Sequence, residues 1–108
     1  MKKQSGSIVL FIWLLVGCQL IGYAPAPPVT SQMLAALGRR ESHATIAKLR
    51  EGRTLFAHRC IECHTLPPLW HYSSEDWPSI VTRMSHRASL TDAQRDAVVA
   101  YILAVRSQ

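Results

Sequence analysis

Two cysteines and a histidine in the second half of the chain have a spacing that can hold an iron cofactor. Cys60 and Cys63 are separated by Ile61 and Glu62, and His64 follows directly. This is the attachment pattern of c-type haem. Two intervening residues let one helical turn present both thiols to the haem vinyl groups, and the adjacent histidine then points at the iron. The sequence predicts one covalent haem c, with Cys60 and Cys63 as thioethers and His64 as the proximal iron ligand.

A second axial ligand is expected downstream of this motif. Met84 lies twenty residues after His64, at the end of an apolar helical face. A thioether ligand favours ferrous iron and suits electron carriage, so Met84 is the predicted distal ligand. His86 is an alternative distal ligand that would lower the reduction potential of the haem. His71, His58 or a vacant site are further alternatives. Met84 as a plain core residue also stays open.

Two chemistries without haem use the same residues. Cys60, Cys63, His64 and a further ligand form a conceivable zinc site. The adjacent Cys63-His64 pair is poor spacing for a closed zinc site. A thioredoxin-like dithiol is the other alternative, but no βαβ pattern surrounds the cysteines.

The N-terminus has the pattern of an export signal that ends at the third cysteine. Two lysines precede a run of apolar residues at positions 8–16, which is shorter than the roughly 20 residues of a membrane span. Leu15-Val16-Gly17-Cys18 resembles a bacterial lipobox. We therefore expect residues 1–17 to be a lipoprotein signal peptide, cleaved before Cys18, whose acyl chains anchor the protein. An ordinary signal peptide and an uncleaved anchor helix are the alternatives.

Export also sets the expected location and charge. The protein is predicted to lie on the periplasmic side of a membrane, and Gln19 after the lipidated cysteine weakly favours the outer membrane. Removal of Lys2 and Lys3 leaves 10 basic and 7 acidic residues, so the formal net charge falls from +5 to +3. Two haem propionates would bring it close to neutral. No arginine cluster interleaved with aromatic residues is present, so nucleic acid is not an expected partner.

The elements that must position the motif are predicted to be helical. Residues 18–31 are Pro-rich and predict an extended tether, and residues 32–108 predict one small domain. Residues 32–37 are a short candidate helix that stops at Gly38. Residues 41–59 are the next candidate, with one face formed by Ile46, Leu49, Gly52, Leu55 and Phe56. The glycine in this face suggests close approach by another element, although a helix break there is an alternative.

Two more helices are expected after the motif. Pro67-Pro68 ends any helix that begins near the cysteines. Ser73 or Ser74 predicts the cap of a helix whose apolar face is formed by Trp77, Ile80, Val81 and Met84. Thr91 and Gln94 match a capping box, and the helix after it has an apolar face of Ala97, Val98, Tyr101, Ile102 and Val105. No segment alternates with period two, so the predicted class is all-α.

The stretch from Gly52 to the C-terminus resembles a small class I cytochrome c domain. Residues 52–56 resemble the helix that precedes the family's haem motif, Tyr101 resembles the aromatic that packs across that glycine, and residues 77–84 resemble the segment with the distal methionine. The family often has a Gly-Pro pair after the motif, whose proline carbonyl accepts a hydrogen bond from the proximal histidine. Here Pro67 or Pro68 is earlier and lacks the glycine.

This resemblance implies a fold and a function. The expected fold is a helical domain packed around one covalently bound haem. The expected function is electron transfer in a periplasmic or membrane-associated respiratory chain, without enzymatic activity. Its partners would be quinol- or cytochrome-oxidising complexes, or a terminal oxidase or reductase. The alternative function is a c-type haem sensor or gas-binding protein with a labile distal site.

The remaining histidines and polar aromatics have competing interpretations. His43 and His58 are expected on the surface. His71 is expected as a packed or solvated loop residue, with an approach to a haem propionate as the alternative. Trp77 is expected either to contact a haem propionate or to pack in the core. Arg83 is expected either to contact a propionate or to lie on a solvated face. Tyr101 is expected to be a packing residue, because it lies on the apolar face of the last predicted helix.

Overall fold

The computed structural model describes residues 26–39, 43–60 and 68–108. These residues form four helices: α2 (Ser31–Gly38), α3 (Ile46–His58), α4 (Trp77–Ser85) and α5 (Asp92–Arg106). They contain no strand, so the prediction of an all-α class is confirmed for this part of the chain. None of these helices has the length and apolar character needed to cross a membrane.

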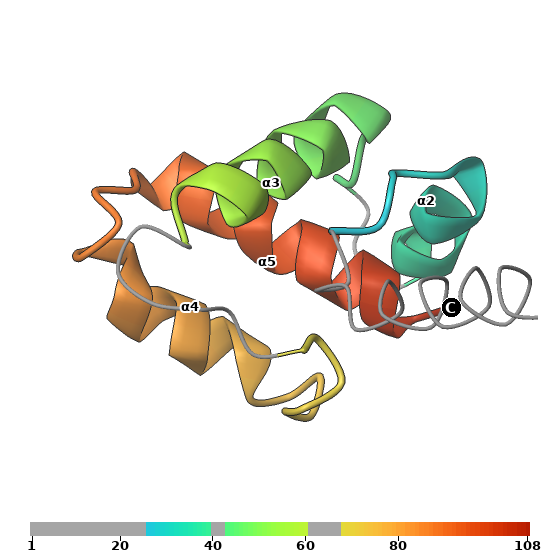
Figure 1. The fold of residues 1–108 in the computed structure, drawn as a ribbon. Helices are drawn as coiled ribbons and strands as arrows, with labels where there is room; N and C mark the ends of the chain where they lie inside the picture. The colour runs from blue at the N-terminus through green and yellow to red at the C-terminus, as the bar shows by residue number, and fades with distance from the viewer. Residues whose placement is uncertain (1–25, 40–42, 61–67) are drawn as a thin grey trace, which may run out of the picture.

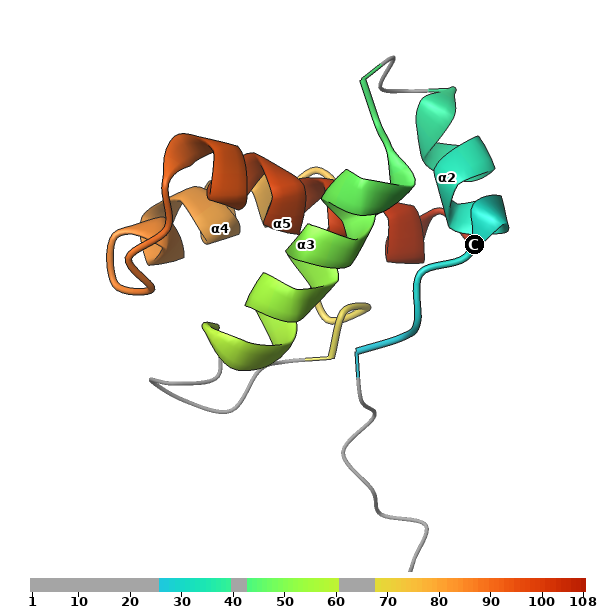
Figure 2. The same cartoon turned by 90° about the horizontal axis from the view of Figure 1, so that it is seen from above.

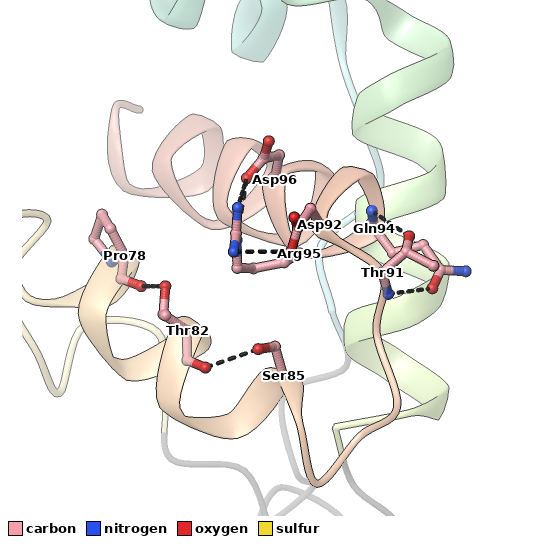
Figure 3. Close-up of polar contacts among 8 residues, drawn as sticks. All are labelled: Pro78, Thr82, Ser85, Thr91, Asp92, Gln94, Arg95 and Asp96. Carbon is pink, nitrogen blue, oxygen red and sulfur yellow. Dashed lines mark hydrogen bonds and ion pairs between the residues drawn. The ribbon is translucent and has the colours of Figure 1, made fainter.

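Three of the helices begin at a threonine that caps them. The hydroxyls of Thr30, Thr45 and Thr91 accept hydrogen bonds from backbone N–H groups three residues on, at 3.1–3.2 Å. Such bonds satisfy N–H groups that have no partner inside the helix. At Thr91 the bond is reciprocal, because its own N–H donates to the Gln94 side chain at 3.0 Å (Figure 3). The predicted capping box is therefore confirmed.

The cap at Thr45 also explains one wrong boundary. The sequence predicts a helix that starts at Glu41, whereas α3 starts at Ile46. Thr45 has extended backbone geometry, and its hydroxyl accepts a hydrogen bond from the Lys48 N–H. This cap fixes the start of α3 at the next residue, Ile46. The predicted end is nearly correct, since Arg59 is the C-terminal cap of α3.

Helix α4 is preceded by a turn that Ser73 closes. The Ser73 hydroxyl accepts the Asp76 N–H at 3.2 Å and donates to the Asp76 carboxylate at 2.8 Å. The helix itself starts at Trp77, and Pro78 occupies its first turn, where a missing N–H has no cost. The N-cap of α4 is Asp76, whose side chain makes no capping hydrogen bond, so the prediction of Ser73 or Ser74 as the cap is wrong. Ser73 instead closes the turn that precedes the helix.

Helices α3 and α5 make the most extensive contact in the described domain, and Figure 1 shows them packed across each other. The contact centres on Gly52. A Cβ atom there would overlap the carbonyl group of Ala97 and lie 2.8 Å from the Tyr101 Cβ atom. Only a glycine permits this separation, so the predicted close approach is confirmed and the predicted alternative of a helix break is wrong.

The apolar interior has two clusters that share α3 and α5. Cluster 1 lies between α3, α4 and α5 and comprises Phe56, Leu69, Trp77, Val81, Val98, Tyr101 and Ile102. Cluster 2 joins α2 to the same two helices and comprises Met33, Leu37, Leu49, Ala100 and Ala104. Accordingly, α2 and α4 lie towards opposite ends of the α3–α5 pair (Figures 1 and 2).

The segment before α2 lies against the helical domain. Ala26 and Val29 pack on cluster 1. The guanidinium of Arg53 donates to the carbonyl oxygens of Ala26 and Pro27 at 3.0–3.2 Å. The buried Tyr101 hydroxyl donates to the Pro27 carbonyl at 2.7 Å. Hence the last residues of the Pro-rich stretch are held by α3 and α5.

Candidate cofactor site

Cys60, the first cysteine of the predicted haem motif, lies just beyond the end of α3. The chain continues the last turn of this helix, because the N–H groups of Arg59 and Cys60 both donate to the Leu55 carbonyl, at 2.8 and 3.4 Å. The Cys60 side chain is half-buried and packs against cluster 1. Cys63 and His64, the other motif residues, lie outside the described part of the chain, as does Cys18.

Burial affects the chemistry of the Cys60 thiol. Removal from water penalises the thiolate, so burial raises the pKa of Cys60 above its usual value. Reactive dithiols have the opposite property, a lowered thiol pKa. This gives no support to the thioredoxin-like alternative.

The predicted distal ligand Met84 is the most exposed residue of the predicted apolar face of α4, in which Ile80 is partly covered. Trp77 and Val81 on α4 are 3% and 6% exposed, whereas Met84 is 37% exposed. Seven residues are almost two helical turns, so Met84 projects from nearly the same side of α4 as Trp77. A methionine that fills a core gap would be buried, so the exposure of Met84 argues against that interpretation.

His86, the alternative distal ligand, projects from a different side. It lies two residues beyond Met84 and has helical backbone angles, as the C-terminal cap of α4. Two residues correspond to about 200° around a helix, so the two side chains leave the helix in nearly opposite directions. Because Met84 shares the side of Trp77 and cluster 1, the backbone favours Met84 over His86. The His86 side chain is exposed.

The three other histidines in the described part of the chain are on the surface. His43 and His58 are exposed, as predicted. His71 is also exposed, and its ring lies edge-on to that of Tyr72 with the centroids 4.7 Å apart. This agrees with the predicted solvated loop residue. Among the described residues, no hydrogen bond or ring contact joins any of these three histidines to Cys60 or to Met84.

Trp77 and Arg83 have different surroundings. The indole N–H of buried Trp77 donates to the Leu69 carbonyl at 3.0 Å, so its one donor is already engaged. This supports core packing for Trp77. The Arg83 side chain is exposed and donates to the Ser79 hydroxyl at 3.3 Å. It agrees with a solvated face.

Tyr101 has the predicted packing role and a second role that the sequence did not reveal. It is fully buried, and its ring packs against Phe56 with the centroids 5.8 Å apart. Burial raises the pKa of its hydroxyl to about 12, partly offset by the nearby Arg53. The hydroxyl therefore stays protonated at physiological pH and can donate to Pro27. This pairing spans 74 residues and ends on a backbone carbonyl, which carries no sequence signal.

Two partly covered side chains from different parts of the chain pack on cluster 1. Cys60 at the end of α3 and Ile80 on α4 are only partly covered and both pack on this cluster, and Met84 follows Ile80 by one helical turn. The zinc alternative has no support from the described residues, among which no three His, Cys, Asp or Glu side chains converge on a metal-sized site. It would depend on Cys63 and His64.

Comparisons of this chain with protein-family models, with curated proteins and with solved structures gave no match.

Proposed function

We propose that this protein is an exported, lipid-anchored c-type cytochrome that transfers electrons. Cys60 and Cys63 would hold one haem c, His64 and Met84 would bind its iron, and Cys18 would carry the lipid. The partners would be redox proteins at the membrane, such as a quinol- or cytochrome-oxidising complex or a terminal oxidase or reductase. The haem would supply one-electron chemistry by alternating between ferric and ferrous iron.

The observation that carries this proposal is the position of Cys60. The motif Cys60-Ile61-Glu62-Cys63-His64 starts directly where α3 ends, at the edge of cluster 1. Helix α4 lines the same cluster and carries Met84 as an exposed residue on its apolar face. Thus Cys60, the proposed first thioether, packs on cluster 1, and Met84, the proposed sixth ligand, lies on a helix that contributes Trp77 and Val81 to the same cluster.

The protein residues have separate tasks in this proposal. The Gly52 contact fixes α3, and with it Cys60, against α5. Burial of Trp77 and Val81 fixes α4, and with it Met84, against the same helix. Fixed positions of the haem attachment point at Cys60 and of the iron ligand Met84 would keep the haem environment the same in both oxidation states, which lowers the reorganisation needed for electron transfer.

Substitution of the proposed distal ligand tests the carrier function. Met84→Ala should abolish the red-region absorption band that methionine ligation gives to ferric haem. It should also lower the reduction potential by on the order of 100 mV, within the span of about 0.8 V that axial ligands cover. His86→Ala is the matched control, because it alters an exposed side chain on the same helix, and both properties should remain unchanged.

The same variants separate the carrier from the sensor alternative. Reduced wild-type protein should bind carbon monoxide slowly or not at all, since Met84 occupies the sixth position, and Met84→Ala should bind it rapidly. Rapid binding to the wild-type protein would favour the gas-binding alternative. A Met84→Ala spectrum identical to that of the wild type would refute the ligand assignment.

A further inference from the structure

The loop before α4 presents two aromatic side chains to solvent. Trp70 is 68% exposed and Tyr72 is 38% exposed, in a described domain whose other large apolar side chains, apart from Met84, are more covered. Tryptophan and tyrosine combine an apolar ring with one polar atom, and both are enriched where proteins meet the membrane–water interface. Two such side chains on one loop make it a candidate contact surface.

The loop is held in place by the interior of the domain. The Tyr72 ring lies edge-on to Trp77, with the centroids 5.5 Å apart. Trp77 in turn binds the Leu69 carbonyl, and the His71 N–H donates to the Pro68 carbonyl at 2.9 Å. Trp70 therefore projects from a fixed support and would lose little conformational entropy on binding.

The N-terminal segment is fixed to the same region of the domain. Arg53 and Tyr101 hold the Ala26 and Pro27 carbonyls through four hydrogen bonds. Ala26 packs on cluster 1, to which Leu69 at the start of the aromatic loop also belongs. Figure 2 shows the first described residues (blue) near the loop (yellow). The first described residues thus lie near the loop that carries Trp70 and Tyr72.

The length of chain before this point limits how far the domain can lie from a lipid on Cys18. Eight residue steps separate Cys18 from Ala26. Even fully extended they span at most about 28 Å. Because Ala26 is pinned rather than free, the side of the domain where the chain enters is the side kept nearest to the bilayer.

We propose that Trp70 and Tyr72 form a second membrane contact, inserting into the interface of the bilayer that holds the lipid anchor. This inference rests on the lipid anchor of the proposed function. The short segment between Cys18 and Ala26 raises the local concentration of the aromatic loop at the membrane. Insertion of the two rings would then give the domain one preferred orientation. The domain would lie with this loop towards the headgroups.

Hydroxyl-radical footprinting of the full lipidated, haem-loaded protein on phosphatidylethanolamine/phosphatidylglycerol vesicles tests the contact. A companion protein carries, after Gln19, an insertion of about twenty Gly/Ser residues with a protease site. The longer linker should lower the effective concentration of the aromatic loop at the membrane by up to about sixfold. Cleavage of this companion releases the same domain into solution. Trp77, which is 3% exposed, serves as the internal reference.

Trp70 should be oxidised several-fold more slowly in the anchored protein with the natural linker than in the released domain. The anchored protein with the inserted linker should give an intermediate rate. The oxidation rate of Trp77 should be the same in all three. Equal oxidation of Trp70 in the anchored protein with the natural linker and in the released domain overturns the inference, whether both are exposed or both are protected by the protein itself. Protection that requires an added redox partner also overturns it, in favour of a protein contact. The lipid mass on Cys18 and the haem absorption are measured on the same samples, so failure of the proposed function is seen separately.

Discussion

At the scale of single residues, Tyr101 joins parts of the chain that are far apart in sequence. Its ring packs on Phe56, its Cβ atom faces Gly52, and its hydroxyl donates to Pro27. Burial raises its pKa to about 12. One side chain therefore links the core, the α3–α5 contact and the N-terminal segment.

The raised pKa of Tyr101 predicts a specific loss of stability in alkali. An unfolded tyrosine titrates near pH 10, so between about pH 10 and 12 the folded state binds more protons and stability falls as pH rises, by up to about 1.4 kcal/mol per pH unit. Below pH 10 this contribution is fully present. Urea unfolding of wild type and Tyr101→Phe at about pH 9 and pH 11 measures it.

Tyr101→Phe is its own control, because it removes the titrating group and keeps the ring. Its stability should be lower by about 1 kcal/mol at pH 9, from the lost hydrogen bond, and should fall less steeply in alkali. The same pH dependence in both proteins would contradict the assignment.

Single-residue chemistry was only partly predictable from the sequence. The burial of Tyr101 and Trp77 follows from helical periodicity, and the exposure of His43 and His58 from their polar neighbours. The partners of their polar atoms were not predictable. Pro27 and Leu69 accept through backbone carbonyls, and every residue has such a carbonyl, so only the fold selects which one is used.

At the scale of elements, the α3–α5 contact depends on the absence of a side chain at Gly52. Any larger residue must push the helices apart, because the added Cβ atom meets backbone of Ala97 rather than a flexible side chain. Cys60 follows α3 directly, so this contact also determines where the proposed haem motif begins.

Gly52→Ala should therefore destabilise the protein by about 1–3 kcal/mol or more, as overpacking of a tight contact does. Thermal unfolding of the haem-loaded protein measures the loss. Gly38→Ala provides a matched control at the end of α2, where no atom lies within 4 Å of an added Cβ. It should be neutral or stabilising by up to about 1 kcal/mol. Equal losses in the two variants would show that the α3–α5 approach is not the cause.

Elements with a local signal were predicted better than those without one. The Thr91 capping box gave the start of α5, and the spacing of Ala97, Val98 and Tyr101 gave its buried face. The start of α3 was predicted five residues too early, because Thr45 has no matching acidic or amide residue at the third helical position that would mark it as a cap. The face of α4 was correct, but its uncovered end at Met84 becomes apparent only in the fold.

At the scale of the whole molecule, Arg53 decides how firmly the N-terminal segment is attached. It provides three of the four hydrogen bonds to Ala26 and Pro27. Arg53→Met retains much of the aliphatic packing but removes these bonds. A spin label placed at the exposed Pro28 through Pro28→Cys should become more mobile in this variant.

Arg50→Met is the control for this experiment, since Arg50 is exposed on the same helix and its side chain makes no hydrogen bond to the described residues of the segment. The label should remain as immobile as in the parent protein. If Arg53→Met also leaves the label immobile, the guanidinium does not hold the segment.

A haem stain after denaturing electrophoresis tests whether haem is attached covalently through Cys60 and Cys63. The protein is expressed with the cytochrome c maturation machinery, beside a Cys60→Ser/Cys63→Ser variant. The wild-type band should stain for haem, because thioether bonds survive denaturation, and the double variant should not. An unstained wild-type band, or a double variant that stains equally, would contradict the account.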